Sequence, residues 1–354
     1  MAGTVVVLRM SINVTSEERL PSFPPTRAPL GCALAGIACA LVASLGAPAG
    51  VAADSPYPAR TVRVIAPFPP GSGVDIIARV TAQALTESLK QPFVVENRAG
   101  AGGTIGSDIA AKAAPDGYTL LLGNVSTLAI GPNLYRNLTY DPVRDFAPIT
   151  HITSMSSVLL VHPSVPARSL REFVALARAK PRSLTYASAG SGTTTHLGME
   201  LFKSLAKIDM LHVPYKGSAA ALTDVIAGQL QVILSTTATS IGHIKAGKLR
   251  PLGVTSLKRQ ELLPDVPTIS EAMFPGYEVI VWQAMVAPAR TPEPVIAKLN
   301  AEIVKSLRTP AMKEQLANQG LEGVGNSPKE FGEFIKSEYA KWGKVVKISG
   351  ATVD

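Results

Sequence analysis

The loop from Pro67 to Asp75 carries the residue types in this chain that are best suited to chemistry. Its sequence, PFPPGSGVD, follows an apolar run and precedes an amphipathic segment, so it would join a buried strand to a helix. Its prolines are rigid and its glycines permissive. Such a loop presents backbone N–H groups at the positive end of a helix, which favours an anion. It has no lysine to grip a triphosphate and no obvious nucleophile. The loop therefore predicts binding of a small anion rather than its transformation.

Two other glycine-rich loops follow predicted strands, at residues 97–103 and 190–195. In the second of these, serine and threonine hydroxyls together with the amides of a helix start suit a carboxylate. Thr193 or Thr194 would also be an ordinary N-cap, and both roles can hold at once. Ligands of open parallel sheets lie outside the carboxyl ends of the strands. We therefore expect the three loops to face one another across a cleft.

Several enzyme-like patterns are incomplete. The stretch 100–106, GAGGTIG, resembles a dinucleotide fingerprint, but it lies in the second strand–helix unit and lacks the acidic residue expected about 20 positions later. GSGT at 190–193 lacks the glycine two positions before the serine that a nucleophile elbow needs. His196 and Glu200 share a helix face, yet the five histidines are dispersed and offer no third metal ligand. The sequence therefore predicts no catalysis, no cofactor and no metal.

Some side chains near these loops have more than one interpretation. Asp75 would either cap the helix and bond loop N–H groups or contact an ammonium or hydroxyl group of the ligand. Tyr215 could close over a ligand, and Lys216 could pair with a distal acid or remain a solvated charge. Trp282 lies in the apolar stretch 277–287, where it would form the floor of the cleft or pack the hinge.

The elements that would position these residues alternate between short apolar strands and amphipathic helices. The first predicted unit has strands at 62–66, 93–96 and 118–123, with helices at 75–90 and 104–113. This order implies a parallel sheet with helices on both faces. The second unit has predicted strands at 158–161, 184–187, 211–213, 231–235 and 252–255, with helices at 170–180, 196–205, 218–227 and 241–246. Helices at 294–307, 310–319 and 328–347 would end the chain.

The stretch 277–287 predicts a long strand that crosses back to the first unit. We therefore expect an α/β fold of two parallel-sheet lobes joined by two crossing strands. Residues 54–155 and 285–354 would form lobe 1, and residues 156–284 would form lobe 2.

Composition and the N-terminus predict an exported protein. The chain has 354 residues, 46% of them hydrophobic, which suggests about two domains. Residues 31–45 form an apolar run too short to span a bilayer comfortably; arginines precede it and small residues follow, which is the layout of a signal peptide. We expect residues 1–53 to be a leader cleaved after Ala53, with Ala49 as the second choice and an uncleaved anchor helix as the alternative. Both cysteines lie in this leader, so the mature chain would contain no disulfide or thiolate site.

The charge pattern does not favour a nucleic-acid partner. The formal net charge of +8 comes from scattered basic residues, and aromatic residues make up only 5% of the chain. Nucleic-acid binding would need a basic stripe with stacking aromatic residues. A mildly positive potential would instead help to attract acidic solutes.

Several motifs together resemble those of the receptors of tripartite tricarboxylate transporters, the Bug-type solute receptors. PFPPG at 67–71 with DIIAR at 75–79 resembles their first motif, and ENRAGAGG at 96–103 resembles their second loop. Further matches are PDGYTL at 115–120, VPYKG at 213–217, AGKLR at 246–250 and VPT at 266–268. The resemblance covers essentially all of the mature chain, in order.

This resemblance implies a periplasmic binding protein with a type II-like, two-lobed fold. In the family, a ligand carboxylate sits against the first loop and a facing loop of lobe 2, largely through backbone N–H groups and ordered water. Carried onto this chain, and joined to the residues singled out above, the expected ligand-binding residues are Phe68, Pro70, Gly71, Ser72, Gly73, Asp75, Ser126, Thr127, Ser188, Gly190, Ser191, Gly192, Thr193, Thr194, Tyr215 and Trp282. Two departures leave the ligand open: the family often has glycine at the positions of Ser72 and Ala284.

We therefore expect a monomeric periplasmic receptor, not an enzyme, that closes around a small carboxylate. A di- or tricarboxylate, an acidic amino acid or an aromatic acid would fit. The receptor would deliver its ligand to the membrane permease subunits of a tripartite tricarboxylate transporter. An exported hydrolase or another enzyme on the same two-lobed fold is one alternative, and a receptor that feeds a sensor kinase is another.

Overall fold

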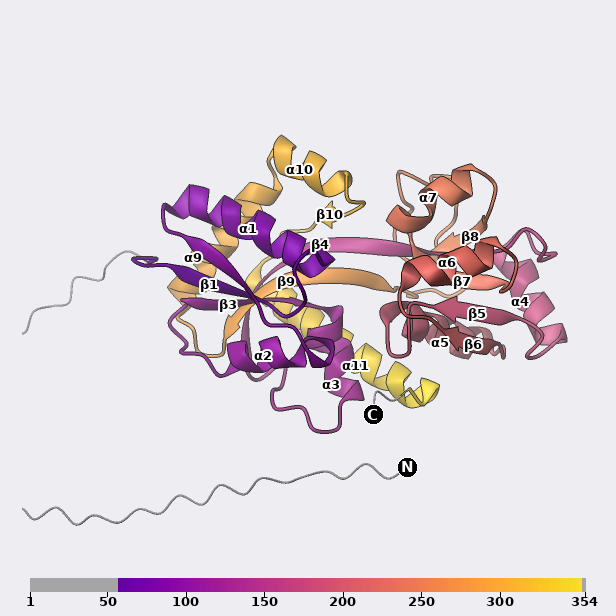
Figure 1. Cartoon of the computed structure of the whole chain (residues 1–354), viewed down its shortest axis with the longest axis horizontal. Helices are drawn as coiled ribbons and strands as arrows, with labels where there is room; N and C mark the ends of the chain where they lie inside the picture. Colours follow the sequence, from indigo (N-terminus) through magenta and orange to yellow (C-terminus); the bar gives the residue numbers. More distant parts are fainter. Residues whose placement is uncertain (1–56, 352–354) are drawn as a thin grey trace, which may run out of the picture. The chain divides into compact units, whose positions relative to one another are not determined.

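A single mixed sheet organises the computed structural model, which describes residues 57–351 (Figure 1). Most of its strands lie in the order β2-β1-β3-β9-β4-β7-β5-β6, while β8 and β10 both pair with β4. The predicted leader, its cleavage site and both cysteines lie outside the described residues.

The strands are β1 (Val62–Ala66), β2 (Phe93–Asn97), β3 (Thr119–Asn124), β4 (Phe146–Val161), β5 (Thr185–Ser188), β6 (Leu211–Pro214), β7 (Val232–Thr236), β8 (Arg250–Val254), β9 (Ile280–Pro288) and β10 (Glu322–Gly323). The α-helices are α1 (Gly73–Leu89), α2 (Thr104–Ala111), α3 (Gly131–Leu134), α4 (Leu170–Ala179), α5 (Thr194–Ala206), α6 (Ser218–Ile226), α7 (Thr237–Lys245), α8 (Ile269–Ala272), α9 (Glu293–Leu307), α10 (Pro310–Ala317) and α11 (Pro328–Ser349). A short 3₁₀ turn, η1 (Ala101–Gly103), precedes α2, and a π-helical turn, η2 (Ser126–Ile130), precedes α3.

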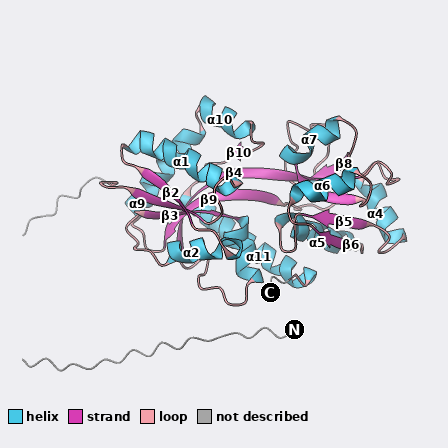
Figure 2. Ribbon diagram, in the orientation of Figure 1, coloured by secondary structure: helices cyan, strands magenta, loops and turns pink. Residues whose placement is uncertain are grey.

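Two long central strands connect the halves of this sheet. β4 and β9 pair in antiparallel register from Phe146↔Pro288 to Ser156↔Ile280. β4 then continues and pairs with β7 from Ser157↔Thr236 onward. We call β1–β3 with their helices the first half, and β5–β8 with theirs the second half. The β4–β9 pair therefore forms a ribbon that joins the two halves (Figure 2).

The first half is a parallel sheet covered on both faces. β1 pairs in parallel with β2 on one side and β3 on the other. Val64, Ile65 and Ala66 are consecutive and completely buried, as expected for a parallel strand between two layers of helices. Helices α1 and α9 pack on one face, while α2, η2 and α11 pack on the other.

The second half repeats this arrangement. β5 pairs in parallel with β6 and β7. Helices α4 and α5 cover one face, and α6 covers the other. The apolar cluster under α4 and α5 continues beneath α11 into the first half, and α11 contacts both η2 and α5. One core therefore lies along the same face of both halves.

Most predicted elements are confirmed, and two are wrong in extent. β1 matches its prediction residue for residue, and the helix predicted at 170–180 is α4, which Ser169 caps. The strand expected at 158–161 is the end of the much longer β4, because hydroxyl-bearing residues that hid the strand pattern are buried within the sheet. The helix expected at 241–246 is α7, which already begins at Thr237. The segment η2–α3 was not predicted at all.

The predicted lobe boundaries fall inside the connecting strands. Residues 155 and 156 lie within β4, and residues 284 and 285 lie within β9. The division into residues 54–155 with 285–354 and residues 156–284 stays a prediction.

Candidate functional site

The carboxyl ends of the parallel strands in the two halves point toward the same segment of β4. The last residue of β3, Asn124, pairs with Gln283 of β9, and Gln283 pairs with Thr153 of β4. The last residue of β7, Thr236, pairs with Ser157 of β4. Thr153 and Ser157 are four residues apart, or roughly 13 Å along an extended strand. The loops that follow these strands therefore converge on the middle of the β4–β9 ribbon.

In the first loop, the hydroxyl of Ser72 caps α1. Ser72 has extended backbone angles, and its Oγ accepts the N–H of Asp75 at 3.2 Å. The N–H groups of Gly73 and Val74 have no acceptor within the described chain. These two donors lie at the positive end of a 17-residue helix, where an anion is stabilised. Pro70 and Gly71 are exposed beside them.

Asp75 holds the shape of this loop and is not its helix cap. The residue is only 3% exposed. It accepts the N–H of Gly71 at 2.9 Å, the amide of Asn97 at 2.8 Å and the guanidinium of Arg79 at 3.0 Å. Burial would raise the pKa of Asp75, but the hydrogen bonds from Arg79, Gly71 and Asn97 outweigh it and lower the pKa. The predicted loop-bonding role is thus confirmed, while the predicted capping role belongs to Ser72.

The loops after β1, β2 and β3 pack together. The amide of Asn97 also donates to the carbonyl of Phe68 at 3.0 Å. A Cβ at Gly103 would come within 2.6 Å of the Thr127 side chain and 3.1 Å of the Phe68 ring, so only glycine fits there. Thr127 is buried, and its hydroxyl lies 3.0 Å from the N–H of Asn124. Gly103 therefore lies close to both Phe68 and Thr127, and half-buried Ser126 precedes Thr127 in the chain.

In the second half, the loop between β5 and α5 forms a second helix start. Thr193 is the N-cap of α5, as predicted, and its Oγ1 accepts the N–H of His196 at 3.3 Å. The N–H groups of Thr194 and Thr195 have no acceptor in the described chain. Ser191 is the exposed hydroxyl of this loop. The predicted residues Ser188, Gly190 and Gly192 lie in the same turn and bond to groups behind it.

Tyr215 belongs to the neighbouring loop, between β6 and α6. Its N–H donates to the carbonyl of Ser188 at 3.1 Å, which joins the two loops. Its hydroxyl donates to Asp224 at 2.6 Å, and this hydrogen bond raises the pKa of Tyr215. The side chain that was expected to close over a ligand is therefore held by α6 in this structure.

Trp282 and Gln283 lie on opposite faces of β9. Trp282 is completely buried and donates its indole N–H to Glu338 of α11 at 2.8 Å. This is the position of a packing residue, the second of its two interpretations. The Nε2 of Gln283 lies 3.6 Å from the point where a Cβ of Gly73 would stand. Sequence reasoning missed Gln283, although a polar residue inside the apolar run 277–287 was a signal for it.

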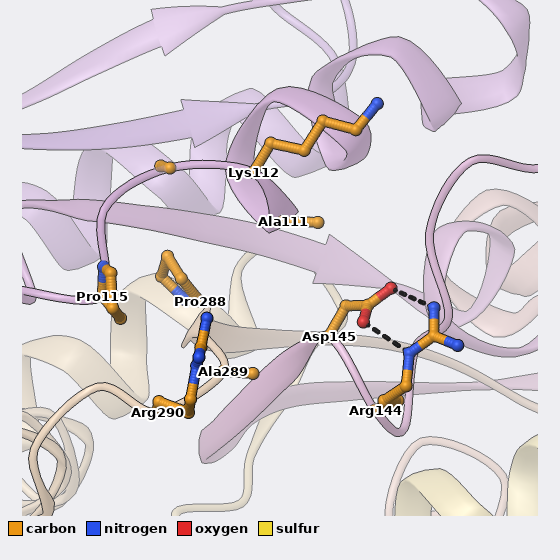
Figure 3. A pocket seen from close by; sticks show the side chains of 9 residues that line it. Ala111, Lys112, Pro115, Arg144, Asp145, Pro288, Ala289 and Arg290 are labelled. Carbon is orange, nitrogen blue, oxygen red and sulfur yellow. Dashed lines mark hydrogen bonds and ion pairs between the residues drawn. The ribbon is translucent and has the colours of Figure 1, made fainter.

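Two hollows in the surface lie away from these loops. One, of about 500 Å³, is bordered by the start of β4 and the end of β9 (Figure 3). Its charged side chains are largely paired, Arg144 with Asp145 at 2.8 Å and Lys112 with Asp108 at 2.7 Å. The other, of about 470 Å³, lies between α1, α9 and α10. Because neither hollow contains a residue of the converging loops, the loops remain the candidate site.

Residues 57–351 offer neither a metal-binding cluster nor a helix suited to span a membrane. No three histidine, cysteine or acidic side chains in this range gather to hold a metal ion. No helix in this range combines the length and the apolar character needed to cross a membrane.

Comparison with known proteins identifies the family. A model described as "Tripartite tricarboxylate transporter family receptor" matches residues 77–351. BugT of Bordetella pertussis is 38% identical over 311 residues, which are 88% of this chain and 95% of BugT.

Solved structures agree with this match. A structure of an R. palustris protein with adipate is 36% identical, has a TM-score of 0.69, and covers 84% of this chain and 99% of its own. MatC from Rhodopseudomonas palustris with bound malate is 32% identical, has a TM-score of 0.66, and covers 82% of this chain and 100% of its own. These matches confirm the family and the two-lobed α/β fold predicted from the motifs. The chain therefore belongs to the tripartite tricarboxylate transporter receptor family, whose members are periplasmic solute-binding receptors and not enzymes.

Proposed function

We propose that this protein captures a small carboxylate between its two halves and delivers it to the permease of a tripartite tricarboxylate transporter. The observation that carries the proposal is the set of donors at the start of α1. There, the N–H groups of Gly73 and Val74 lack acceptors within the described chain, and the amide of Gln283 lies beside Gly73. Two relatives in the family were solved with adipate and with malate, both small dicarboxylates.

The loops would bind an anion through neutral donors instead of a free cation. Such binding is compatible with later release of the ligand. Arg79, the nearest cation on α1, already pairs with Asp75 at 3.0 Å. The ligand would therefore meet helix dipoles and neutral N–H donors instead of a free guanidinium. We expect an affinity in the micromolar range, which corresponds to about −8 kcal/mol. The same donors at Thr194 and Thr195 of α5 would contact the other end of the ligand.

We further propose where the protein acts and how it moves. The leader would be cleaved after Ala53 and the mature protein would act in the periplasm as a monomer. Ligand binding would shift an existing equilibrium between open and closed arrangements of lobe 1 and lobe 2.

Calorimetric titration of the mature protein with adipate, malate, aspartate and benzoate tests this function. At least one of these acids should bind, whereas glucose and glycerol should not. Binding of the uncharged solutes alone would contradict the carboxylate assignment.

Two substitutions at Gln283 locate the site. Gln283→Leu removes one donor and should lower the affinity for the acid that binds by about tenfold. Gln283→Glu keeps the shape but places a negative charge beside the donors, so it should weaken binding much more. Gln83→Glu makes the same charge change on the exposed face of α1 and should leave the affinity unchanged. Equal affinities for all three variants would show that the ligand does not bind at the α1 loop.

A further inference from the structure

Three aromatic rings form a stack directly behind the β5–α5 loop. His196 of α5 and His212 of β6 lie face to face, with ring centres 4.0 Å apart and planes within 9° of each other. Tyr186 of β5 continues the stack at 4.8 Å from His212. We call these three residues the imidazole stack. The ligand contacts proposed above do not include it.

Each histidine of the stack is bonded to a different part of the loop. Nδ1 of His196 accepts the N–H of Gly192 at 3.0 Å. Nε2 of His212 lies 2.7 Å from Oγ of Ser188. That same hydroxyl lies 3.2 Å from both the N–H and the carbonyl of Gly190. The two imidazoles therefore fix both ends of the turn that leads into α5.

The bond from Gly192 defines the state of His196. An imidazole nitrogen accepts a hydrogen bond only when it carries no proton, so His196 must be neutral with its proton on Nε2. A second proton would abolish this acceptor. If both rings were protonated, two positive charges would stand 4.0 Å apart, where like charges repel strongly.

The charged groups around the stack come from α5 and the strands beneath it. Glu200 accepts the hydroxyl of Tyr186 and pairs with Lys203 at 2.8 Å. Burial is the main cause that lowers the pKa of both histidines. The pKa of His212 falls to about 4, with His196 and Lys203 lowering it further and Glu200 opposing them. The surroundings thus favour the neutral form of both rings, and the hydrogen bond from Gly192 requires the neutral form of His196.

We propose that His196 and His212 are positioning residues of the ligand site, and that the loop from Ser188 to Thr194 keeps its binding shape only while the imidazole of His196 is neutral. The proposal rests on the proposed function in one respect, namely that this loop contacts the ligand. The inward bonds of Gly192 and Ser188 leave the hydroxyl of Ser191 and the first amides of α5 free to face outward. Acidification would release this turn. It would then weaken the ligand contacts made by the second half and leave those of the α1 loop unchanged.

Nitrogen-15 NMR of glycine-labelled mature protein tests the mechanism without any ligand. The Gly192 amide, assigned by its loss in Gly192→Ala, should shift as the pH is lowered from 7.5 to 4. Asparagine can place an amide oxygen near the position of Nδ1 and cannot be protonated, so His196→Asn should keep a hydrogen-bonded Gly192 amide that ignores pH. His162 accepts the N–H of Ser164 elsewhere in the second half, so His162→Asn is the matched control and should leave the wild-type response intact. A Gly192 amide that ignores pH in the wild type, or still follows it in His196→Asn, overturns the proposal.

Calorimetric titration with adipate tests the consequence for binding. At pH 7.5, His196→Ala should bind adipate about tenfold more weakly, the loss expected for one supporting hydrogen bond, and His196→Asn should recover most of that loss. Adipate itself titrates near pH 5, so only affinities of variants relative to wild type at the same pH are compared. At pH 4, His196→Asn should bind more tightly relative to wild type than it does at pH 7.5.

The two experiments separate this inference from the proposed function. If wild type binds none of the acids, the carboxylate function fails while the NMR response still decides the role of the stack. If adipate binds but His196→Ala binds it as wild type does, the stack has no positioning role and the function stands. Gln283→Leu should weaken adipate binding without altering the pH response of Gly192.

Discussion

At the scale of single residues, the site contains a negative charge beside donors proposed to bind a negative ligand. The carboxylate of Asp75 is compensated by Arg79, Asn97 and the N–H of Gly71. Its pKa is lowered, so it stays charged at neutral pH and keeps these bonds. A fully bonded carboxylate can shape an anion site because little of its charge reaches the ligand.

His151 predicts a pH dependence of stability. It is 4% exposed, stacks on Phe334 at 5.0 Å, and bonds to the carbonyl of Thr153 at 3.1 Å. Burial lowers its pKa to about 4. The unfolded chain, with an ordinary histidine, binds more protons between pH 6.5 and 4, so the free energy of unfolding falls as the pH falls through that range. For His151 alone the loss should reach about 3 kcal/mol.

Urea denaturation between pH 7 and 4 measures this effect. His151→Gln, which does not titrate, should flatten the decline relative to wild type. His243→Gln, on the partly exposed side of α7, is the control and should decline as wild type does. Parallel curves for wild type and His151→Gln would assign the pH dependence to other groups.

The sequence predicted where the loops lie better than it predicted the contacts of single side chains. Ser72 and Asp75 form the S-x-x-D pattern of a helix start, which assigns the cap to the serine; the interpretation of Asp75 as a cap overlooked it. Trp282 and Gln283 alternate across β9, so only one of them can face the loops. Trp282 fills the core with its large side chain, which leaves Gln283 on the face of the loops.

At the scale of elements, α11 is tied to the connecting ribbon through one buried carboxylate. Oε2 of Glu338 accepts the indole N–H of Trp282 at 2.8 Å and that of Trp342 at 3.0 Å. Its other oxygen pairs with Lys341. These are the only two tryptophans of the chain. Helix α11 and strand β9 are therefore joined by a polar contact inside an otherwise apolar core.

Glu338→Ala should be strongly destabilising. It leaves two buried indole N–H groups without an acceptor, and each such group costs about 1–3 kcal/mol. Guanidinium denaturation followed by tryptophan fluorescence measures the fall in the free energy of unfolding, because unfolding exposes both buried tryptophans. Glu333→Ala, on the exposed face of the same helix, should change stability by less than about 0.5 kcal/mol. Similar values for the two variants would show that the buried contact contributes nothing.

The length of β4 could not be predicted, because polar residues of this strand are buried among apolar ones. Thr150, Thr153 and Ser157 interrupt its apolar pattern, yet all three are buried. Thr150 donates to the carbonyl of Asn326 at 2.8 Å, a partner 176 residues away that no local pattern reveals. By contrast, β1 and β3 each contain a run of three apolar residues, Val64–Ala66 and Leu120–Leu122, which the sequence alone reveals.

At the scale of the whole molecule, the two halves also meet away from the β4–β9 ribbon. Gly320, after α10, stands against Ala238 in the first turn of α7. A Cβ at Gly320 would come within 2.5 Å of the Ala238 Cβ. No side chain can occupy that space without moving one half relative to the other.

Gly320→Ala should therefore destabilise more than its backbone conformation alone explains. Gly350 has nearly the same positive φ but no atom within 4 Å of its Cβ position, so Gly350→Ala reports the backbone cost by itself, about 1 kcal/mol. In thermal unfolding, Gly320→Ala should have a lower Tm than Gly350→Ala. Adding Ala238→Gly to Gly320→Ala should remove this difference in Tm. If Ala238→Gly gives no recovery, the contact does not limit the approach of the halves.

The β4–β9 ribbon has a consequence for how affinity can change. Its strands stay paired across both halves, so closure of the proposed kind must twist a sheet elastically instead of turning a flexible linker. The register of the pair is irregular between Pro148 and Thr150 and between His151 and Thr153, where such a sheet bends most readily. Stiffness at these positions would set the fraction of closed receptor, and apparent affinity scales with that fraction. Substitutions there could therefore retune the receptor for scarce or abundant solute while every atom that contacts the ligand stays the same.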